Sequence, residues 1–403
     1  MDISHPHPAL PSVATPSVLP KEGSTVGLSA WADIDLTAIS DNVAELGRRA
    51  GDADVMAVIK GDAYGHGLVP VAGAALAGGA TYLAVAQLSE ALAARAAGVS
   101  APILTWLFPP GADLAAAVRA DLTVSAGAPW ALTEIAAAAR ATGSAARVHL
   151  KADTGLGRGG AWREDLAGML RDAARLEAEG IVDVEGIFSH FACADLPGHP
   201  TVRAQQETFV AVIADAERVG LRPRIRHLAN SAATLTNPSA QFDMVRPGIS
   251  VYGLSPVPDI GGPTHFGLRE AMRVTARLIN VKDCGPGQGI SYGHQYTTKG
   301  ETRLGLVPLG YADGIPRHAG NVGPMQVGGR HYTVAGRVCM DQMVLDLGAD
   351  SPAAAGDEVV LIGREAHGEP TAQDWAAAID TINYEIVTRL GPRVPRRYLG
   401  VQQ

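Results

Sequence analysis

Short apolar segments alternate with longer Ala-, Leu- and Arg-rich segments of helical period between residues 55 and 253. Most of these apolar segments are rich in β-branched residues, which is typical of parallel strands buried on both faces. The alternation is the pattern of repeated βα units. Eight candidate strands occur, at residues 55–60, 81–86, 102–106, 122–125, 146–153, 184–190, 225–230 and 244–248. They predict a (β/α)8 TIM-like barrel over residues 29–255, with an open doubly wound sheet as the alternative.

The chain from residue 256 to residue 403 has a different pattern, in which apolar and polar residues alternate between glycine-rich turns. Candidate strands lie at 272–281, 303–308, 325–327, 332–338, 343–347 and 358–362, which predicts a mainly antiparallel β domain. One helix is expected over 371–390, after a capping-box start at Thr371 and Asp374 and before Gly391 and Pro392. The early run 31–36 also alternates, so it is expected to join this second domain as a strand.

Composition excludes several classes of protein. A formal net charge of -8 and a pI near 5.8 argue against nucleic-acid binding. No apolar stretch reaches the roughly 18 residues of a membrane span. Residues 1–28 are rich in Pro, Ser and His without the pattern of a signal peptide, so a disordered tail is expected. Cys193, Cys284 and Cys339 have neither disulfide-framework nor zinc-site spacing, which indicates a reducing cytoplasm and no metal.

Polar residues stand where the predicted strands end. Lys60 ends the first strand, His190 the sixth and Asn230 the seventh, while Arg158 lies in a glycine-rich loop after the fifth. Each has an ordinary structural explanation when taken alone, as a lysine closing a strand, a core histidine or a helix N-cap. Barrel enzymes collect their reactive groups at the C-terminal ends of the strands, so these residues are expected to face one cavity. A lysine in such a place can form a Schiff base with pyridoxal phosphate (PLP).

Motifs from Trp31 to the C-terminus are similar to those of one enzyme family. They are Lys60-Gly-Asp-Ala-Tyr-Gly-His-Gly67, Lys151-Ala-Asp-Thr-Gly-Leu-Gly-Arg158, Phe188-Ser-His190-Phe, Asn230-Ser-Ala-Ala, Val245-Arg246-Pro-Gly-Ile249, Ser291-Tyr292-Gly, Gly310-Tyr311-Ala-Asp-Gly314, Gly336-Arg-Val-Cys-Met340-Asp341-Gln and Asn383-Tyr384-Glu. In these motifs the chain resembles the alanine racemase family. The departures are Gly61-Asp62, where Ala-Asn is common, and Pro247, where Phe often stands, and neither touches a catalytic position.

The resemblance implies a PLP enzyme with a role for each matching residue. It makes Lys60 the Schiff-base lysine. The other cofactor-binding residues implied are Tyr64, His190, Asn230, Ser231, Arg246, Gly248, Ile249 and Tyr384, with the amides of Gly248 and Ile249 and three hydroxyls on the phosphate. Those implied for the substrate are Arg158 and Met340 at its carboxylate, Tyr311 and Asp341 near the entrance, and Lys151, carbamylated in many relatives, beside Arg158.

Racemisation needs an acid and a base on opposite faces of a planar centre. The resemblance places Lys60 on one face and Tyr292 on the other, with Tyr292 supplied by the partner subunit of a head-to-tail homodimer. The resemblance also places Arg246 at the pyridine nitrogen, and an arginine does not hand its proton to the ring. The function implied is PLP-dependent interconversion of L-alanine and D-alanine, which supplies D-alanine for peptidoglycan.

Other functions fit the sequence less well. Residues 155–160 satisfy the G-x-G-x-x-G pattern of dinucleotide-binding proteins, but they follow a fifth strand and place Arg158 where backbone must approach the pyrophosphate. A non-catalytic PLP-binding protein shares only the barrel with this family. A barrel-fold amino-acid decarboxylase is expected to carry an acidic group in place of Arg246. A broader-specificity amino-acid or serine racemase remains an alternative.

Overall fold

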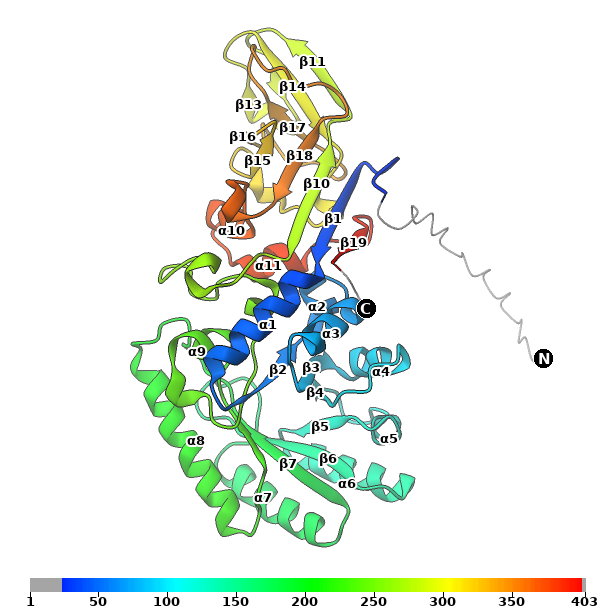
Figure 1. Cartoon of the computed structure of the whole chain (residues 1–403), viewed down its shortest axis with the longest axis vertical. Coiled ribbons are helices and arrows are strands. Elements are labelled where there is room, and N and C mark those ends of the chain that lie inside the picture. The colour runs from blue at the N-terminus through cyan, green and yellow to red at the C-terminus, as the bar shows by residue number, and fades with distance from the viewer. Residues whose placement is uncertain (1–23, 401–403) are drawn as a thin grey trace, which may run out of the picture.

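The computed structural model describes residues 24–400. Residues 1–23 of the disordered tail predicted over residues 1–28 lie outside the described residues. Figure 1 shows two bodies, a barrel surrounded by helices in the lower half and a group of sheets in the upper half. Helix α11 (Asn383–Thr388) lies between them.

Eight parallel strands make up the lower body, in the order β8-β7-β6-β5-β4-β3-β2-β9. A parallel bridge between Asn230 and Arg246 joins the two ends of this order, so the sheet nearly closes into a barrel. The strands are β2 (Asp54–Val58), β3 (Tyr82–Gln87), β4 (Ile103–Leu107), β5 (Thr123–Ala126), β6 (Ala146–Lys151), β7 (Val182–Phe188), β8 (Ile225–His227) and β9 (Met244–Val245). Each overlaps one predicted strand, and the (β/α)8 barrel is confirmed.

Helices lie around the barrel or at the ends of its strands. They are α1 (Leu36–Ala50), α2 (Lys60–Gly65), α3 (Leu68–Ala77), α4 (Leu88–Ala96), α5 (Leu114–Arg119), α6 (Pro129–Thr142), α7 (Arg163–Ala178), α8 (Pro200–Arg218) and α9 (Ser231–Thr236). In α1 the buried Ile39, Val43 and Leu46 form the apolar stripe that packs on the barrel. None of the helices between residues 24 and 400 has the length and apolar character needed to cross a bilayer.

The upper body consists of mainly antiparallel sheets, as predicted. Its largest sheet has the order β16-β15-β18-β10-β1-β19, in which β1 pairs antiparallel with β10 and parallel with β19. These strands are β1 (Ala30–Asp35), β10 (Met272–Arg277), β15 (Pro324–Val327), β16 (Arg330–Thr333), β18 (Glu358–Ile362) and β19 (Arg396–Leu399). The smaller sheets contain β11 (Asn280–Cys284), β14 (Thr302–Val307) and β17 (Met343–Asp346), and the pair β12 (Gly289–Ile290) and β13 (Tyr296–Thr297).

Two of the predicted elements are each divided into two. The strand expected over 272–281 is two strands, β10 and β11, which belong to different sheets. The helix expected over 371–390 is also two helices, α10 (Ala372–Ala378) and α11. The expected cap is present, since the Thr371 hydroxyl accepts from the Asp374 amide, but Asp380 has a φ of 55° and ends the first helix. This break allows Asn383 to donate a hydrogen bond of 2.8 Å to the carbonyl of Ser255.

Short 3-10 helices occur in the loops. They lie at Pro238–Ala240, Ile249–Tyr252, Pro263–Phe266, Tyr292–His294, Tyr311–Asp313, Arg317–Ala319 and Glu365–His367. Three of them, which begin at Ile249, Tyr292 and Tyr311, carry residues expected in the active site.

Candidate active site

A cavity of about 300 Å3 lies at the C-terminal ends of the barrel strands. Four of its lining side chains are basic, Lys60, Lys151, Arg158 and Arg246, and none is acidic. An excess of fixed positive charge in an enclosed site favours an anionic ligand. The other lining residues are Val58, Tyr64, Trp106, Phe188, His190, Asn230, Ser231, Gly248, Ile249 and Tyr384. The cavity therefore brings together all the barrel residues expected in the site, and Tyr384 as well.

Lys60 begins a short segment with left-handed backbone. Residues 61–64 have φ values between 52° and 64°, and three of them carry a Cβ. Such a conformation costs about 1–2 kcal/mol for each residue with a Cβ, so it persists only where surrounding contacts hold it. The segment places Lys60 and Tyr64, at its two ends, in the same cavity, with the Lys60 Nζ 5.9 Å from the Tyr64 ring centroid.

Two side chains hold this left-handed segment. The Nδ1–H of His66 faces the carbonyl oxygens of Ala63 and Tyr64 at 3.1 and 2.9 Å. The Nε–H of Arg396, from β19, donates to the carbonyl of Gly65 at 2.9 Å. The last strand of the chain therefore helps to fix the loop that carries Lys60.

The amine of Lys60 is more easily deprotonated than an ordinary lysine. Burial lowers its pKa, and the nearby charge of Arg158 lowers it further, against a smaller raising effect of Glu90. Burial also lowers the pKa of Lys151 to about 8, again with help from Arg158. A neutral amine is the nucleophile toward carbonyl carbon, so both lysines are suited to covalent chemistry.

Arg246 is fixed in its place by hydrogen bonds from both Nη atoms. Nη2 donates to the Ser189 carbonyl at 2.7 Å and lies 3.3 Å from Nδ1 of His190, and Nη1 lies 3.0 Å from Nδ1 of His227. Burial lowers the pKa of Arg246 to about 9, which leaves it a cation at neutral pH. Its charge in turn contributes to the lowered pKa of His190, after burial.

Neutral donors gather at one end of the cavity. Ser231 Oγ accepts hydrogen bonds from the amides of Gly248 at 2.8 Å and Ser250 at 3.4 Å. The rings of Tyr64 and Tyr384 lie 6.2 Å apart, and burial raises the pKa of both, so both remain hydroxyl donors. A Cβ at Gly248 would collide with the Tyr64 hydroxyl, so only glycine fits there. Hydroxyls, amides and a helix start form a cradle of the kind that binds phosphate.

The glycine-rich loop at residues 155–160 is built around Asp153. Its carboxylate accepts the amides of Gly155, Leu156 and Gly157 at 2.9, 2.9 and 3.2 Å, and of Arg158 at 3.2 Å. These are the amides that a dinucleotide pyrophosphate would need. The loop therefore serves to present Arg158 to the cavity, and the dinucleotide-binding interpretation is not supported.

Apart from Tyr384, the site residues expected from the C-terminal part of the chain do not line this cavity. Tyr292, Tyr311 and Met340 are 71%, 42% and 53% exposed, and Asp341 forms an ion pair of 2.7 Å with Arg393. Their loops are tied together on the surface. The amide of Tyr311 donates to the Cys339 carbonyl at 3.0 Å, and the following amide donates to the Met340 carbonyl at 2.9 Å. We call these exposed residues, Tyr292, Tyr311 and Met340, the tyrosine surface.

Sequence reasoning omitted several residues at or below the cavity. Trp106 ends a predicted strand, so the rule that selected Lys60 and His190 also applies to it. Its ring lies 5.9 Å from the Lys60 Nζ. His149 lies inside β6 and His227 is the last residue of β8, and both are fully buried below Arg246. Their positions in the strands carry no signal that separates them from ordinary core residues.

Comparison with known proteins identifies one family for both bodies. Two family models match, "Alanine racemase, N-terminal domain" over residues 34–256 and "Alanine racemase, C-terminal domain" over residues 271–398. The alanine racemase of Frankia casuarinae is 58% identical over 381 residues, which cover 94% of this chain and 99% of that protein. The solved alanine racemase of Streptomyces coelicolor A3(2) is 56% identical with a TM-score of 0.91, covering 93% of this chain and 99% of that one. That of a D-cycloserine-producing Streptomyces lavendulae is 52% identical with the same TM-score of 0.91, over 93% and 98%. The chain therefore belongs to the alanine racemase family.

Proposed function

We propose that this chain interconverts L-alanine and D-alanine with PLP held on Lys60, and so supplies D-alanine for peptidoglycan. The observation that carries the proposal is the cavity in which Lys60 lies among three further cations and a neutral phosphate cradle, with no acidic side chain. This donor set fits PLP, which needs an amine for its aldehyde and neutral or positive groups for its phosphate. When bound, PLP withdraws electrons from the substrate and acidifies its Cα–H bond.

Arg158 is suited to bind the substrate carboxylate. It lies in the loop ordered by Asp153 and faces the cavity beside Lys151. As an ammonium, Lys151 repels Arg158, and after burial the charge of Arg158 helps to lower the pKa of Lys151. Carbamylation of Lys151 would turn this repulsion into an ion pair that orients Arg158, and its pKa of about 8 gives more of the neutral amine that reacts with carbon dioxide.

Proton transfer on the two faces of the substrate is assigned to Lys60 and to Tyr292 of the partner subunit. Within one chain Tyr292 is exposed and lies outside the cavity, so a single subunit has an acid–base group on one face only. The tyrosine surface supports a head-to-tail homodimer, because Tyr292, Tyr311 and Met340 are exposed and lie on loops that are hydrogen-bonded to one another. A two-fold pairing of this kind gives two equivalent shared sites.

Arg246 supports racemisation over other PLP reactions. It would face the pyridine nitrogen as a cation that holds its proton, so the ring accepts less of the negative charge that develops at Cα. The match to a C-terminal family domain also argues against a PLP-binding protein that consists of the barrel alone. We place the enzyme in the cytoplasm, where the free thiols of Cys193, Cys284 and Cys339 stay reduced.

An absorption spectrum and a chiral assay test the proposed function. The purified protein with PLP should show the visible absorption of protein-bound cofactor and convert L-alanine to D-alanine, with L-serine as the competing substrate. Borohydride reduction should attach the cofactor to the peptide that contains Lys60. The proposal fails if no conversion occurs at saturating PLP, or if the label lies on a peptide without Lys60. Conversion of L-serine at an equal rate would indicate the broader-specificity alternative.

Gly248→Ala is expected to weaken PLP binding. The added Cβ would displace the Tyr64 hydroxyl and remove one donor from the phosphate, which corresponds to a loss of about 10-fold or more in affinity. Titration of the cofactor-free protein with PLP measures the effect. Gly168→Ala is the matched control, because Gly168 lies in α7 with open space around it. An unchanged dissociation constant in Gly248→Ala would show that this end of the cavity does not hold the phosphate.

A further inference from the structure

Four polar side chains follow one another through the interior of the barrel, and the proposed function uses only the first. They are Arg246, His227, His149 and Glu185, which are 5%, 0%, 0% and 9% exposed. Arg246 Nη1 lies 3.0 Å from Nδ1 of His227, and Nε2 of His227 lies 2.9 Å from Nδ1 of His149. Nε2 of His149 lies 3.9 Å from Oε2 of Glu185. We call these residues the barrel relay.

The direction of every proton in the barrel relay follows from Arg246. A guanidinium has only donors, so Nδ1 of His227 must be the acceptor and its proton must sit on Nε2. That N–H can only donate to Nδ1 of His149, which places the proton of His149 on its own Nε2. Both rings are then neutral, in agreement with burial and the Arg246 charge, which lower the pKa of His149 to about 3 and that of His227 well below its usual value.

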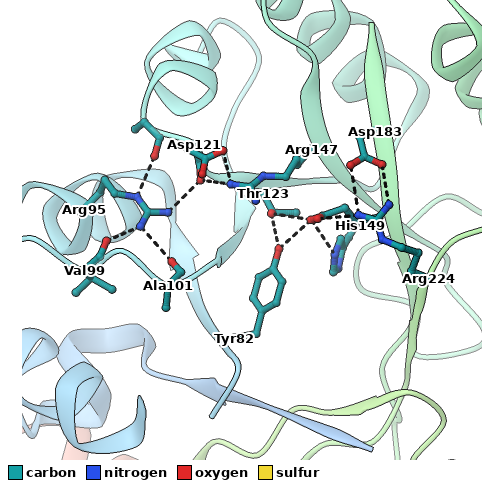
Figure 2. Close-up of polar contacts among 12 residues, drawn as sticks. Tyr82, Arg95, Val99, Ala101, Asp121, Thr123, Arg147, His149, Asp183 and Arg224 are labelled. Atoms are coloured by element: carbon teal, nitrogen blue, oxygen red, sulfur yellow. Dashed lines mark hydrogen bonds and ion pairs between the residues drawn. The ribbon is translucent and has the colours of Figure 1, made fainter. Parts of the chain in front are cut away.

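The far end of the barrel relay is a fixed negative charge. Glu185 accepts hydrogen bonds from the Tyr82 hydroxyl at 3.1 Å and the Thr123 hydroxyl at 3.2 Å, and pairs with Arg224 at 3.1 Å. Figure 2 shows Tyr82, Thr123, His149 and Arg224 directed toward the same point in the barrel. The carboxylate favours the tautomer in which the His149 Nε2–H faces it, so both ends of the barrel relay specify the same polarity.

Packing alone does not explain the two histidines. Gly186 makes room for one of them, since a Cβ there would lie 2.7 Å from Nδ1 of His149. Phe188 stacks on His227 with ring centroids 4.7 Å apart. Among the described residues, the Nε2 of His149 has no hydrogen-bond partner, which is costly for a buried polar atom. An apolar side chain at position 149 would avoid this cost, so core packing does not account for a histidine there.

We propose that His227 and His149, with Glu185 at the far end, are positioning residues that fix the plane of Arg246 where it meets the cofactor and so help to keep the reaction to racemisation. The bond from Nη1 to His227 and the bond from Nη2 to Ser189 hold the guanidinium on two sides. Loss of the bond to His227 would allow the guanidinium to rotate. The catalytic consequence rests on the proposed function, because it acts through the contact of Arg246 with PLP.

The test compares two substitutions at one position. His149→Leu removes the acceptor for the His227 N–H, so the bond between His227 and Arg246 should weaken. The ratio of pyruvate formed by transamination to D-alanine formed by racemisation should rise about 10-fold, the effect of one charge-assisted hydrogen bond. His149→Gln offers a side-chain carbonyl as acceptor and should restore most of the original ratio. Phe209→Leu is the control for lost core packing, because Phe209 is fully buried on α8 away from the barrel relay.

A second measurement needs neither cofactor nor substrate. Nitrogen-15 NMR of the histidine rings in the unsubstituted protein should show His149 and His227 as neutral rings protonated on Nε2. If either ring is protonated on Nδ1, or on both nitrogens, at neutral pH, the proposal is wrong. This measurement does not depend on whether His149→Leu folds. The proposal also fails if His149→Leu changes the product ratio no more than Phe209→Leu. Failure of the proposed function is distinguishable, because it would leave the tautomers as expected and the racemase assay negative.

Discussion

Replacing Lys60 with alanine is expected to lower the rate of alanine racemisation by at least about 1,000-fold, since the variant loses both the amine that holds PLP and the acid–base group on one face of the substrate. PLP should still bind weakly through the phosphate cradle around Ser231 and Gly248, which the substitution does not touch. Steady-state kinetics at saturating PLP measure the loss, and borohydride treatment should no longer attach the cofactor.

Two variants control this experiment. Lys60→Arg keeps the positive charge at the end of β2 but cannot bond to the aldehyde, so it should be as inactive as Lys60→Ala. Lys299→Ala removes an exposed lysine and should keep full activity. If Lys60→Ala retained more than a few per cent of the rate, Lys60 could not be the group that carries the cofactor.

Tyr292→Ala is expected to be nearly inactive as a homodimer, and its activity should return in the presence of Lys60→Ala subunits. In a heterodimer of the two variants, one shared site lacks both groups and the other has both intact. A statistical mixture contains about half heterodimer, so the mixture should reach roughly a quarter of the unsubstituted activity if the two sites work independently. The reason is spatial: Lys60 lies in the barrel cavity, whereas Tyr292 lies exposed on the upper body.

The complementation experiment needs proof that subunits exchange. Subunits with different affinity tags allow the heterodimer to be purified and assayed alone, where it should show about half of the unsubstituted activity. Mixing Lys60→Ala with Arg158→Ala is the negative control, because both residues line the same cavity of one chain and no site in that heterodimer regains both. A verified Lys60→Ala and Tyr292→Ala heterodimer without activity would show that the sites are not shared.

The barrel and its rim of reactive residues follow from local sequence, because a strand buried on both faces must be apolar throughout and its end is marked by the first polar residues. Lys60, His190 and Asn230 are visible for that reason. The helix predicted over 371–390 is interrupted at Asp380, whose positive φ ends α10, and the break allows Asn383 to bond to Ser255, a residue far away in the chain. Helical periodicity continues through the break and does not reveal it.

Two further features depend on tertiary contacts that no local pattern contains. Glycines in the loop after β2 predict a turn, yet its left-handed backbone extends over residues 62–64, which are not glycine. Arg396 of β19 holds that conformation through a long-range hydrogen bond, together with His66, which lies just after it. The barrel relay cannot be predicted from local sequence either. His149 and His227 are buried like ordinary core residues, and only their contacts with each other and with Arg246 distinguish them.

The pairing of β1 has a consequence for the order in which the protein folds during synthesis. β1 is made first, but its neighbours in the sheet are β10, which begins at Met272, and β19, which ends at Leu399. At ordinary ribosomal speeds of about 5–20 residues per second, roughly 10–50 s pass between the synthesis of β1 and that of β10. The barrel strands are all translated in that interval, during which both edges of β1 lack their hydrogen-bonding partners. Chaperones that recognise exposed strands would therefore meet this protein at its N-terminal end, and a ribosome that stops before residue 396 would release a chain whose first strand lacks its parallel neighbour.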